Sequence, residues 1–233
     1  MLDLASVDAL TFDCYGTLID WERGIADALG AVLAAHGVPA PGDDALLERF
    51  ARHETAVEAG PYRRYADVLG AALVAIGEEL GFAPTDDEVR AFGRSVADWP
   101  AFPDSGEALR VLGTRFRLGV LTNCDDDLFA ASARRLGVTF DAVVTAQQVG
   151  AYKPDARGFG VLEERLGLPR ERIVHVAQSL FHDHVPARAL GYATVWVDRR
   201  AGRAGFGATP AATATPDLVV PDMAALAARL SPG

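Results

Sequence analysis

Four apolar segments of the sequence are each followed by polar residues that could do chemistry. These residues are Asp13, Thr122-Asn123, Lys153 and the group Gln178, Ser179 and Asp183. Ligands of open parallel sheets bind beyond the carboxyl ends of the strands, so we expect these side chains to converge. A carboxylate becomes an effective nucleophile when it is held in line with an electrophilic carbon and shielded from water. A neighbouring lysine keeps such a carboxylate ionised and offsets negative charge in the transition state. The pattern therefore predicts a nucleophilic Asp13 assisted by Lys153.

The elements that position these residues alternate along the chain. Short apolar runs typical of buried strands are found at 7–12, 117–121, 141–146, 173–177, 194–197 and 218–220. Helical patterns at 106–112, 128–136 and 159–166 separate them. This alternation predicts an α/β fold, a Rossmann-like, doubly wound and mostly parallel sheet.

One region breaks the alternation. Residues 20–100 are rich in Ala, Leu, Glu and Arg, have helical periodicity and contain no convincing strand. We expect a helical cap domain here, and an α/β core domain built from residues 1–19 and 101–233. Because the cap follows the first strand directly, it must emerge beside Asp13.

The four polar segments also resemble, in order, the motifs of the haloacid dehalogenase superfamily. The first is Phe12-Asp13-Cys14-Tyr15-Gly16-Thr17-Leu18, the second Leu121-Thr122-Asn123, the third Tyr152-Lys153-Pro154-Asp155, and the fourth the segment from Gln178 to Asp183. The resemblance covers nearly the whole chain. It implies the same fold class, with a cap, and a nucleophilic Asp13.

Two positions make the chain similar to the L-2-haloacid dehalogenase branch. Phosphatases of the superfamily usually have an aspartate two residues after the nucleophile to protonate the leaving alcohol, whereas this chain has Tyr15. They also supply an acidic Mg²⁺ ligand where this chain has Gln178, and a neutral amide holds a hard cation less well. The resemblance implies that Asp13 attacks carbon 2 of a short 2-haloacid and expels halide. Water then hydrolyses the ester, with inversion at carbon 2 and without a metal or other cofactor.

The resemblance also suggests roles for the surrounding residues. Thr17, Thr122 and Asn123 offer hydrogen bonds to the substrate carboxylate or the nucleophile, and Asp183 orients Lys153 or the hydrolytic water. Gln178 and Ser179 are expected to contact substrate. Trp21 forms an apolar wall or anchors the cap, and Tyr15 packs against the cap or contacts substrate. Residues 47–49 and Glu54 align loosely with the cap of the dehalogenases, so Arg49 is either the halide ligand from the cap or a solvated helix residue. The segment 60–65 is a second candidate for presenting cationic and aromatic cap residues to the pocket.

Three departures from the dehalogenase pattern leave other functions open. Gln178 replaces a serine, Leu180 an asparagine and Phe159 a tyrosine. Related proteins hydrolyse other small carboxylates by the same aspartate attack, so the substrate could be one of these. A magnesium-dependent phosphatase is an alternative, and so is a binding protein that senses a small carboxylate without turnover.

Composition restricts partners and location. The net charge of −10 and the lack of a Lys/Arg-rich block disfavour nucleic acid and anionic membranes. No apolar run approaches the roughly 20 residues needed to span a bilayer, the N-terminus lacks a secretion signal, and only two cysteines are present. We therefore expect a cytoplasmic protein without structural disulfides. It would act on a small anionic substrate in a locally cationic pocket, and the resemblance suggests a homodimer.

Overall fold

The computed structural model describes residues 6–203 and 207–230. Its core is a sheet of six parallel strands in the order β3-β2-β1-β4-β5-β6. The strands are β1 (Ala9–Phe12), β2 (Arg117–Thr122), β3 (Ala142–Thr145), β4 (Ile173–Ala177), β5 (Ala193–Val197) and β6 (Leu218–Val220). The strand that carries the first motif lies in the middle, with Phe12 in register with Val120 on β2 and Val176 on β4. The predicted fold class is confirmed.

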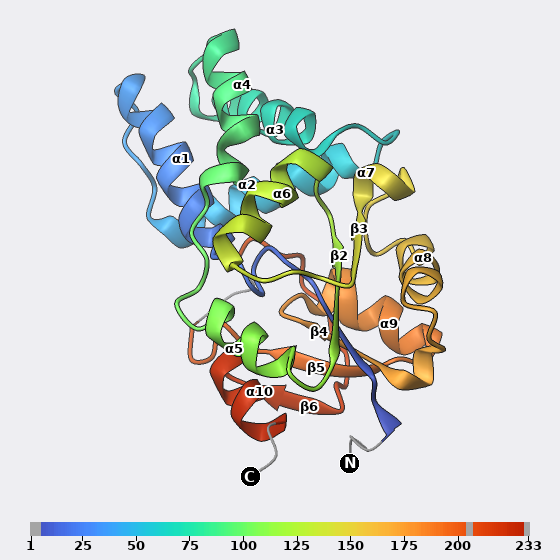
Figure 1. Ribbon diagram of the computed structural model, residues 1–233. Coiled ribbons are helices and arrows are strands. Elements are labelled where there is room, and N and C mark those ends of the chain that lie inside the picture. The colour runs from blue at the N-terminus through green and yellow to red at the C-terminus, as the bar shows by residue number, and fades with distance from the viewer. Residues whose placement is uncertain (1–5, 204–206, 231–233) are drawn as a thin grey trace.

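Helices cover both faces of the sheet, as a doubly wound fold requires. They are α5 (Ser105–Leu112), α6 (Asp126–Leu136), α7 (Ala146–Val149), α8 (Arg157–Leu166), α9 (Val185–Leu190) and α10 (Met223–Leu230), with short helices η3 (Arg170–Arg172) and η4 (Leu180–His184). Helices α5 and α10 lie on one side of the sheet, and α8 and α9 on the other (Figure 1). The central strand is buried along its whole length, which explains why most of its residues before Asp13 are apolar.

Between β1 and β2 the chain forms a helical insertion of α1 (Trp21–Ala35), α2 (Asp43–Glu58), α3 (Tyr65–Leu80), α4 (Asp86–Arg94) and η2 (Ser95–Asp98). The apolar side of α2 shows why this segment folds as a helix. Its buried residues recur at helical spacing and are Leu46, Leu47, Phe50, Ala51 and Glu54. The two connections to the core are tied together, because the Asp20 amide donates to the Pro100 carbonyl and the Phe102 amide donates to the Leu18 carbonyl.

The helical insertion lies beyond one end of the sheet (Figure 1). Since it leaves from the carboxyl end of β1 and returns beside that point, it stands over the strand ends where the polar motifs are found. None of the helices in the described ranges combines the length and apolar character that crossing a membrane requires.

Candidate active site

Asp13 and Lys153 are in direct contact although 140 residues separate them. The Lys153 ammonium lies 2.8 Å from Asp13 Oδ1, and the two residues are only 6% and 4% exposed. Burial raises the pKa of Asp13, and the charge of Lys153 opposes that rise. Burial alone would lower the pKa of Lys153, but Asp13 and Asp183 outweigh it and the pKa is raised. The pair therefore holds a desolvated carboxylate beside a firmly protonated amine.

The second oxygen of Asp13 is also fixed. Thr17 Oγ1 donates to Asp13 Oδ2 at 2.7 Å and accepts from the Gln178 amide at 2.9 Å. The chain can turn back in this way because Gly16 has a φ of 92°, a left-handed conformation that side chains disfavour. A Cβ at Gly16 would also lie 2.8 Å from Trp21 Nε1. The first motif thus orients both carboxylate oxygens, and Thr17 joins it to the fourth motif.

Lys153 has no proton left for a ligand. Besides Asp13, its ammonium donates to Asp183 Oδ1 at 2.7 Å and to the Leu121 carbonyl at 3.0 Å. Its backbone is held by Asn123, whose Oδ1 accepts from the Lys153 amide at 2.7 Å while Nδ2 donates to the Lys153 carbonyl at 3.1 Å. The second motif therefore positions the third.

A buried chain of polar groups holds Asp183. His175 Nε2 lies 2.9 Å from Asp183 Oδ1, and His175 Nδ1 lies 2.9 Å from Thr11 Oγ1. Burial would raise the pKa of Asp183, but Lys153 and His175 hold it well below its usual range. Sequence reasoning gave His175 no role and so missed this contact. Its position on β4, facing the strand that carries the nucleophile, was the available signal.

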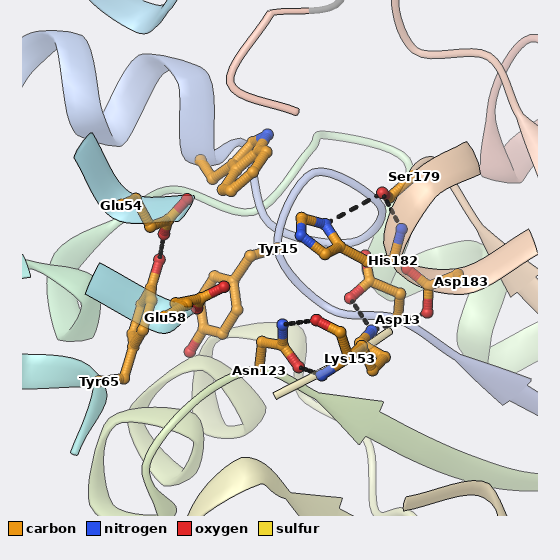
Figure 2. Close-up of a pocket in the computed structure, with 11 residues that line it drawn as sticks. Asp13, Tyr15, Glu54, Glu58, Tyr65, Asn123, Lys153, Ser179, His182 and Asp183 are labelled. Atoms are coloured by element: carbon orange, nitrogen blue, oxygen red, sulfur yellow. Dashed lines mark hydrogen bonds and ion pairs between the residues drawn. The ribbon is translucent and has the colours of Figure 1, made fainter. Parts of the chain in front are cut away.

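These residues form the floor of a small pocket between the core and the helical insertion (Figure 2). The cavity has a volume of about 30 Å³, roughly the volume of one water molecule in the liquid. The core contributes Asp13, Tyr15, Asn123, Lys153, Ser179, His182 and Asp183, and the insertion contributes Trp21, Glu54, Glu58 and Tyr65. Lys153 is the one lysine or arginine among these lining residues, against four carboxyl groups. The expectation of a locally cationic pocket is therefore wrong, because carboxylates engage the only ammonium that reaches the pocket.

Sequence reasoning missed the carboxyl groups that the insertion presents to the pocket. Glu54 is 4% exposed and accepts a 2.6 Å hydrogen bond from the Tyr65 hydroxyl, while the Glu58 carboxyl points into the pocket near Tyr15 (Figure 2). Burial raises the pKa of Glu54 to about 7. Burial, followed by the charge of Glu54, raises the pKa of Glu58 well above its usual range. The available signal was the spacing of four residues on an amphipathic helix, which puts both on one face.

Arg49 is not brought to this pocket. Its guanidinium pairs with Glu79 of α3, which Arg52 and His53 also contact, and it is absent from the pocket lining. In the second cap candidate, residues 60–65, the guanidinium of Arg64 pairs with two aspartates. Asp125 directly precedes α6, and Asp127 lies in its first turn. Tyr65 is the residue of that segment that does line the pocket.

The remaining predicted residues divide into two groups. Trp21 and Ser179 line the pocket, and so does Tyr15, whose hydroxyl is bonded to Ser132 Oγ at 3.0 Å and accepts from Cys124 Sγ at 3.3 Å. Thr122 and Gln178 do not line it. In the part of the chain that the structure describes, Thr122 Oγ1 and Gln178 Oε1 are buried without a hydrogen-bond partner.

His182 is a further pocket residue that the sequence did not single out. Its Nδ1 lies 3.2 Å from Ser179 Oγ, and Ser179 Oγ accepts from the His182 amide at 3.0 Å. Burial lowers the pKa of His182 to about 4. The ring is therefore neutral at neutral pH and adds no positive charge to the pocket.

Comparison with known proteins agrees with this fold. A family model described as haloacid dehalogenase-like hydrolase matches residues 7–181, so the chain belongs to this family of hydrolases. It is similar to (S)-2-haloacid dehalogenase H-109 of Pseudomonas putida, with 25% identity over 88% of this chain and 92% of the relative. It is also similar to haloacetate dehalogenase H-2 of Moraxella sp. strain B, with 27% identity over 96% of this chain and 97% of the relative.

A solved structure shares the fold. The L-2-haloacid dehalogenase of Xanthobacter autotrophicus superposes with a TM-score of 0.78 at 23% identity, covering 95% of this chain and 97% of that one. This likeness extends over the helical insertion as well as the core, since nearly the whole of each chain is matched.

Proposed function

We propose that this protein is a hydrolytic dehalogenase of short 2-haloalkanoic acids that works through an ester on Asp13. The observation that carries the proposal is the buried contact of 2.8 Å between Asp13 and Lys153 beneath a helical insertion. The names of the relatives in Pseudomonas and Moraxella support this choice of substrate.

In the first step an oxygen of Asp13 attacks carbon 2, and the halide leaves with the bonding electron pair. Lys153 and Thr17 hold the carboxylate in one orientation, so the attack starts from a preorganised geometry. In the second step water attacks the carboxyl carbon of the ester, and Lys153 stabilises the negative charge that develops on the oxygen. Asp183, itself held by His175, keeps the ammonium in place for both steps.

We further propose that the reaction is independent of metal. The Lys153 ammonium already lies between Asp13 and Asp183 and compensates their charge. The phosphatase alternative also requires an acid two residues after the nucleophile. The hydroxyl of Tyr15 is a poor acid, because burial raises its pKa well above the usual value, and Ser132 and Cys124 engage it.

The test is a single turnover of chloroacetate in ¹⁸O-water with chelator present, followed by mass spectrometry of the protein. We expect chloride release and ¹⁸O in the peptide that contains Asp13. Asp13→Asn should abolish turnover and keep the fold. Label that enters only glycolate, or an active Asp13→Asn variant, would exclude the ester mechanism. Magnesium-dependent release of phosphate from a generic ester would favour the phosphatase.

Three further parts of the interpretation are proposals of the same kind. The helical insertion is proposed to act as a cap domain over residues 20–100, with residues 1–19 and 101–233 as the core domain. A cytoplasmic location stays a prediction from composition. A homodimer stays a prediction from the family resemblance, and light scattering on the purified protein tests it.

A further inference from the structure

The pocket has two facing walls of different chemistry (Figure 2). Asp13 and Lys153 stand on the core side, at the end of β1 and on the loop between α7 and α8. Glu54 and Glu58 stand on the side of the helical insertion, one helical turn apart on α2. A displacement at carbon proceeds in line, so the group that Asp13 expels must depart away from the core side. The leaving halide is thus directed toward the wall that α2 forms.

Among the described residues that line the pocket, no cation is available to the halide at that wall. Lys153 is the single lysine or arginine of the lining, and its three protons are all donated within the core. His182 is neutral at neutral pH because burial lowers its pKa to about 4. Arg49, the arginine of α2 that the family resemblance suggests as halide ligand, pairs with Glu79 away from the pocket.

A carboxylate at that wall would repel the departing anion, whereas a carboxylic acid would donate a hydrogen bond to it. The two glutamates differ in their freedom to do so. The carboxyl of Glu54 is engaged by the Tyr65 hydroxyl at 2.6 Å. That of Glu58 points into the pocket, and no hydrogen bond or ion pair to it is found in the described part of the chain.

Within the proposed dehalogenase function, we propose that the carboxylic acid of Glu58 receives the leaving halide by donating a hydrogen bond. The carbon–halogen bond breaks as the bond from Asp13 to carbon 2 forms, and the electron pair leaves with the halide. Glu58 keeps its proton throughout. Hydrolysis of the ester then uses one water and yields the hydroxy acid, one proton and the regenerated Asp13 carboxylate.

The surroundings of Glu58 favour the protonated form. Burial raises the pKa of Glu58 most, and the charge of Glu54 on the same helix raises it further. The charge of Lys153 opposes both effects. Tyr65 from α3 and Tyr152 from the third motif also experience the charge of Glu58. Across the pocket lie Asp13, Asp183 and the neutral His182. Of all these groups, Lys153 is the one that carries positive charge, and two carboxylates already balance it.

This arrangement selects among leaving groups. A hydrogen-bond donor stabilises a small, basic halide more than a large, diffuse one, so it helps fluoride most and bromide least. A cationic receptor would discriminate less, because every halide carries the same charge. The site is therefore suited to substrates with a strongly accepting leaving atom, of which fluoroacetate is the simplest halogenated example.

The test compares Glu58→Leu, Glu58→Gln and Glu48→Gln by halide release from fluoro-, chloro- and bromoacetate. Glu48 is an exposed residue of the same helix and serves as the charge-matched control. Glu58→Leu should lower kcat/KM for chloroacetate by about 10²-fold, the typical effect of removing one such donor. The loss should be larger for fluoroacetate and smaller for bromoacetate. Glu58→Gln keeps a donor, so it should remain within about tenfold of wild type.

The pH profile gives a readout that a structural role would not move. Wild type should lose activity on the alkaline side as Glu58 ionises, and Glu58→Gln should not. Glu54→Gln removes the neighbouring charge and should shift the alkaline limb to lower pH. Equal losses for all three halides, or the same alkaline limb in wild type and Glu58→Gln, would overturn the role of Glu58. Failure of wild type to release any halide would instead overturn the proposed function.

Discussion

Replacing Glu54 by Gln should stabilise the protein at alkaline pH and leave its stability almost unchanged at acid pH. Burial raises the pKa of Glu54 from 4.5 to about 7 in the folded protein. Between these values the unfolded chain has already lost the proton that the native state still holds. The free energy of unfolding of wild type therefore falls as the pH rises from about 4.5 to about 7, and it is level above that range. At about 1.4 kcal/mol per pKa unit, the cost above the range is about 3 kcal/mol.

A glutamine at this position cannot ionise, and its side-chain oxygen can still accept the hydrogen bond from the Tyr65 hydroxyl. The measurement is urea unfolding of both proteins at a series of pH values from about 4 to about 8. The difference in free energy of unfolding should be near zero at the acid end and reach about 3 kcal/mol in favour of the variant at the alkaline end. Glu48→Gln, on the exposed side of the same helix, should show no such trend. A difference between wild type and Glu54→Gln that does not change with pH would refute the reasoning.

Three other predictions concern the core side of the site. Lys153→Met leaves Asp13 and Asp183 buried without their cation. The variant should lose about 3–5 kcal/mol in the free energy of unfolding by urea and at least about 10²-fold in kcat/KM for chloroacetate. A stable, active variant would contradict this prediction. Tyr15→Phe leaves the Ser132 hydroxyl without its partner. It should lower the free energy of unfolding by about 1–3 kcal/mol and kcat/KM by less than about tenfold. A loss of activity comparable to that of Asp13→Asn would make Tyr15 a reacting group instead. Dialysis against chelator should leave the rate of chloride release unchanged, and recovery of a lost rate by added Mg²⁺ would contradict the metal-independent mechanism.

Much of the core site could be predicted because its geometry follows from strand order. Asp13, Asn123 and Asp183 follow strands of one parallel sheet, so their carboxyl-end positions bring them together whatever the details of the loops. Short apolar runs identify such strands locally. Strand ends were less certain: the segment predicted as a strand over 141–146 ends at Thr145, because Ala146 begins α7.

The insertion side could not be predicted to the same depth, because it depends on how one helix is rotated about its axis. Consecutive residues of an α-helix are about 100° apart. Arg49 and Glu54, five residues apart, therefore lie about 140° apart around the axis, whereas Glu54 and Glu58 lie within about 40° of each other. The rotation that buries Phe50 turns Glu54 and Glu58 toward Asp13 and leaves Arg49 with Glu79. Nothing in the local sequence specifies which of the two faces meets the pocket.

This rotation changes what the pocket requires of its substrate. The core supplies Asp13, the proposed nucleophile, and Lys153 whichever face of α2 is turned inward, so the proposed covalent step depends on the sheet. In the proposed mechanism the helix determines how the leaving group is recognised, and here it offers acids in place of a cation. With Asp13 and Asp183 ionised and Lys153 protonated, the site already carries an excess negative charge before any anion enters. In the proposed mechanism a haloacid reacts there while Glu58 keeps its proton, because an ionised Glu58 would repel the leaving halide. The burial that raises the pKa of Glu58 therefore favours the proposed reaction, whereas the burial that raises the pKa of Glu54 lowers the stability of the folded protein.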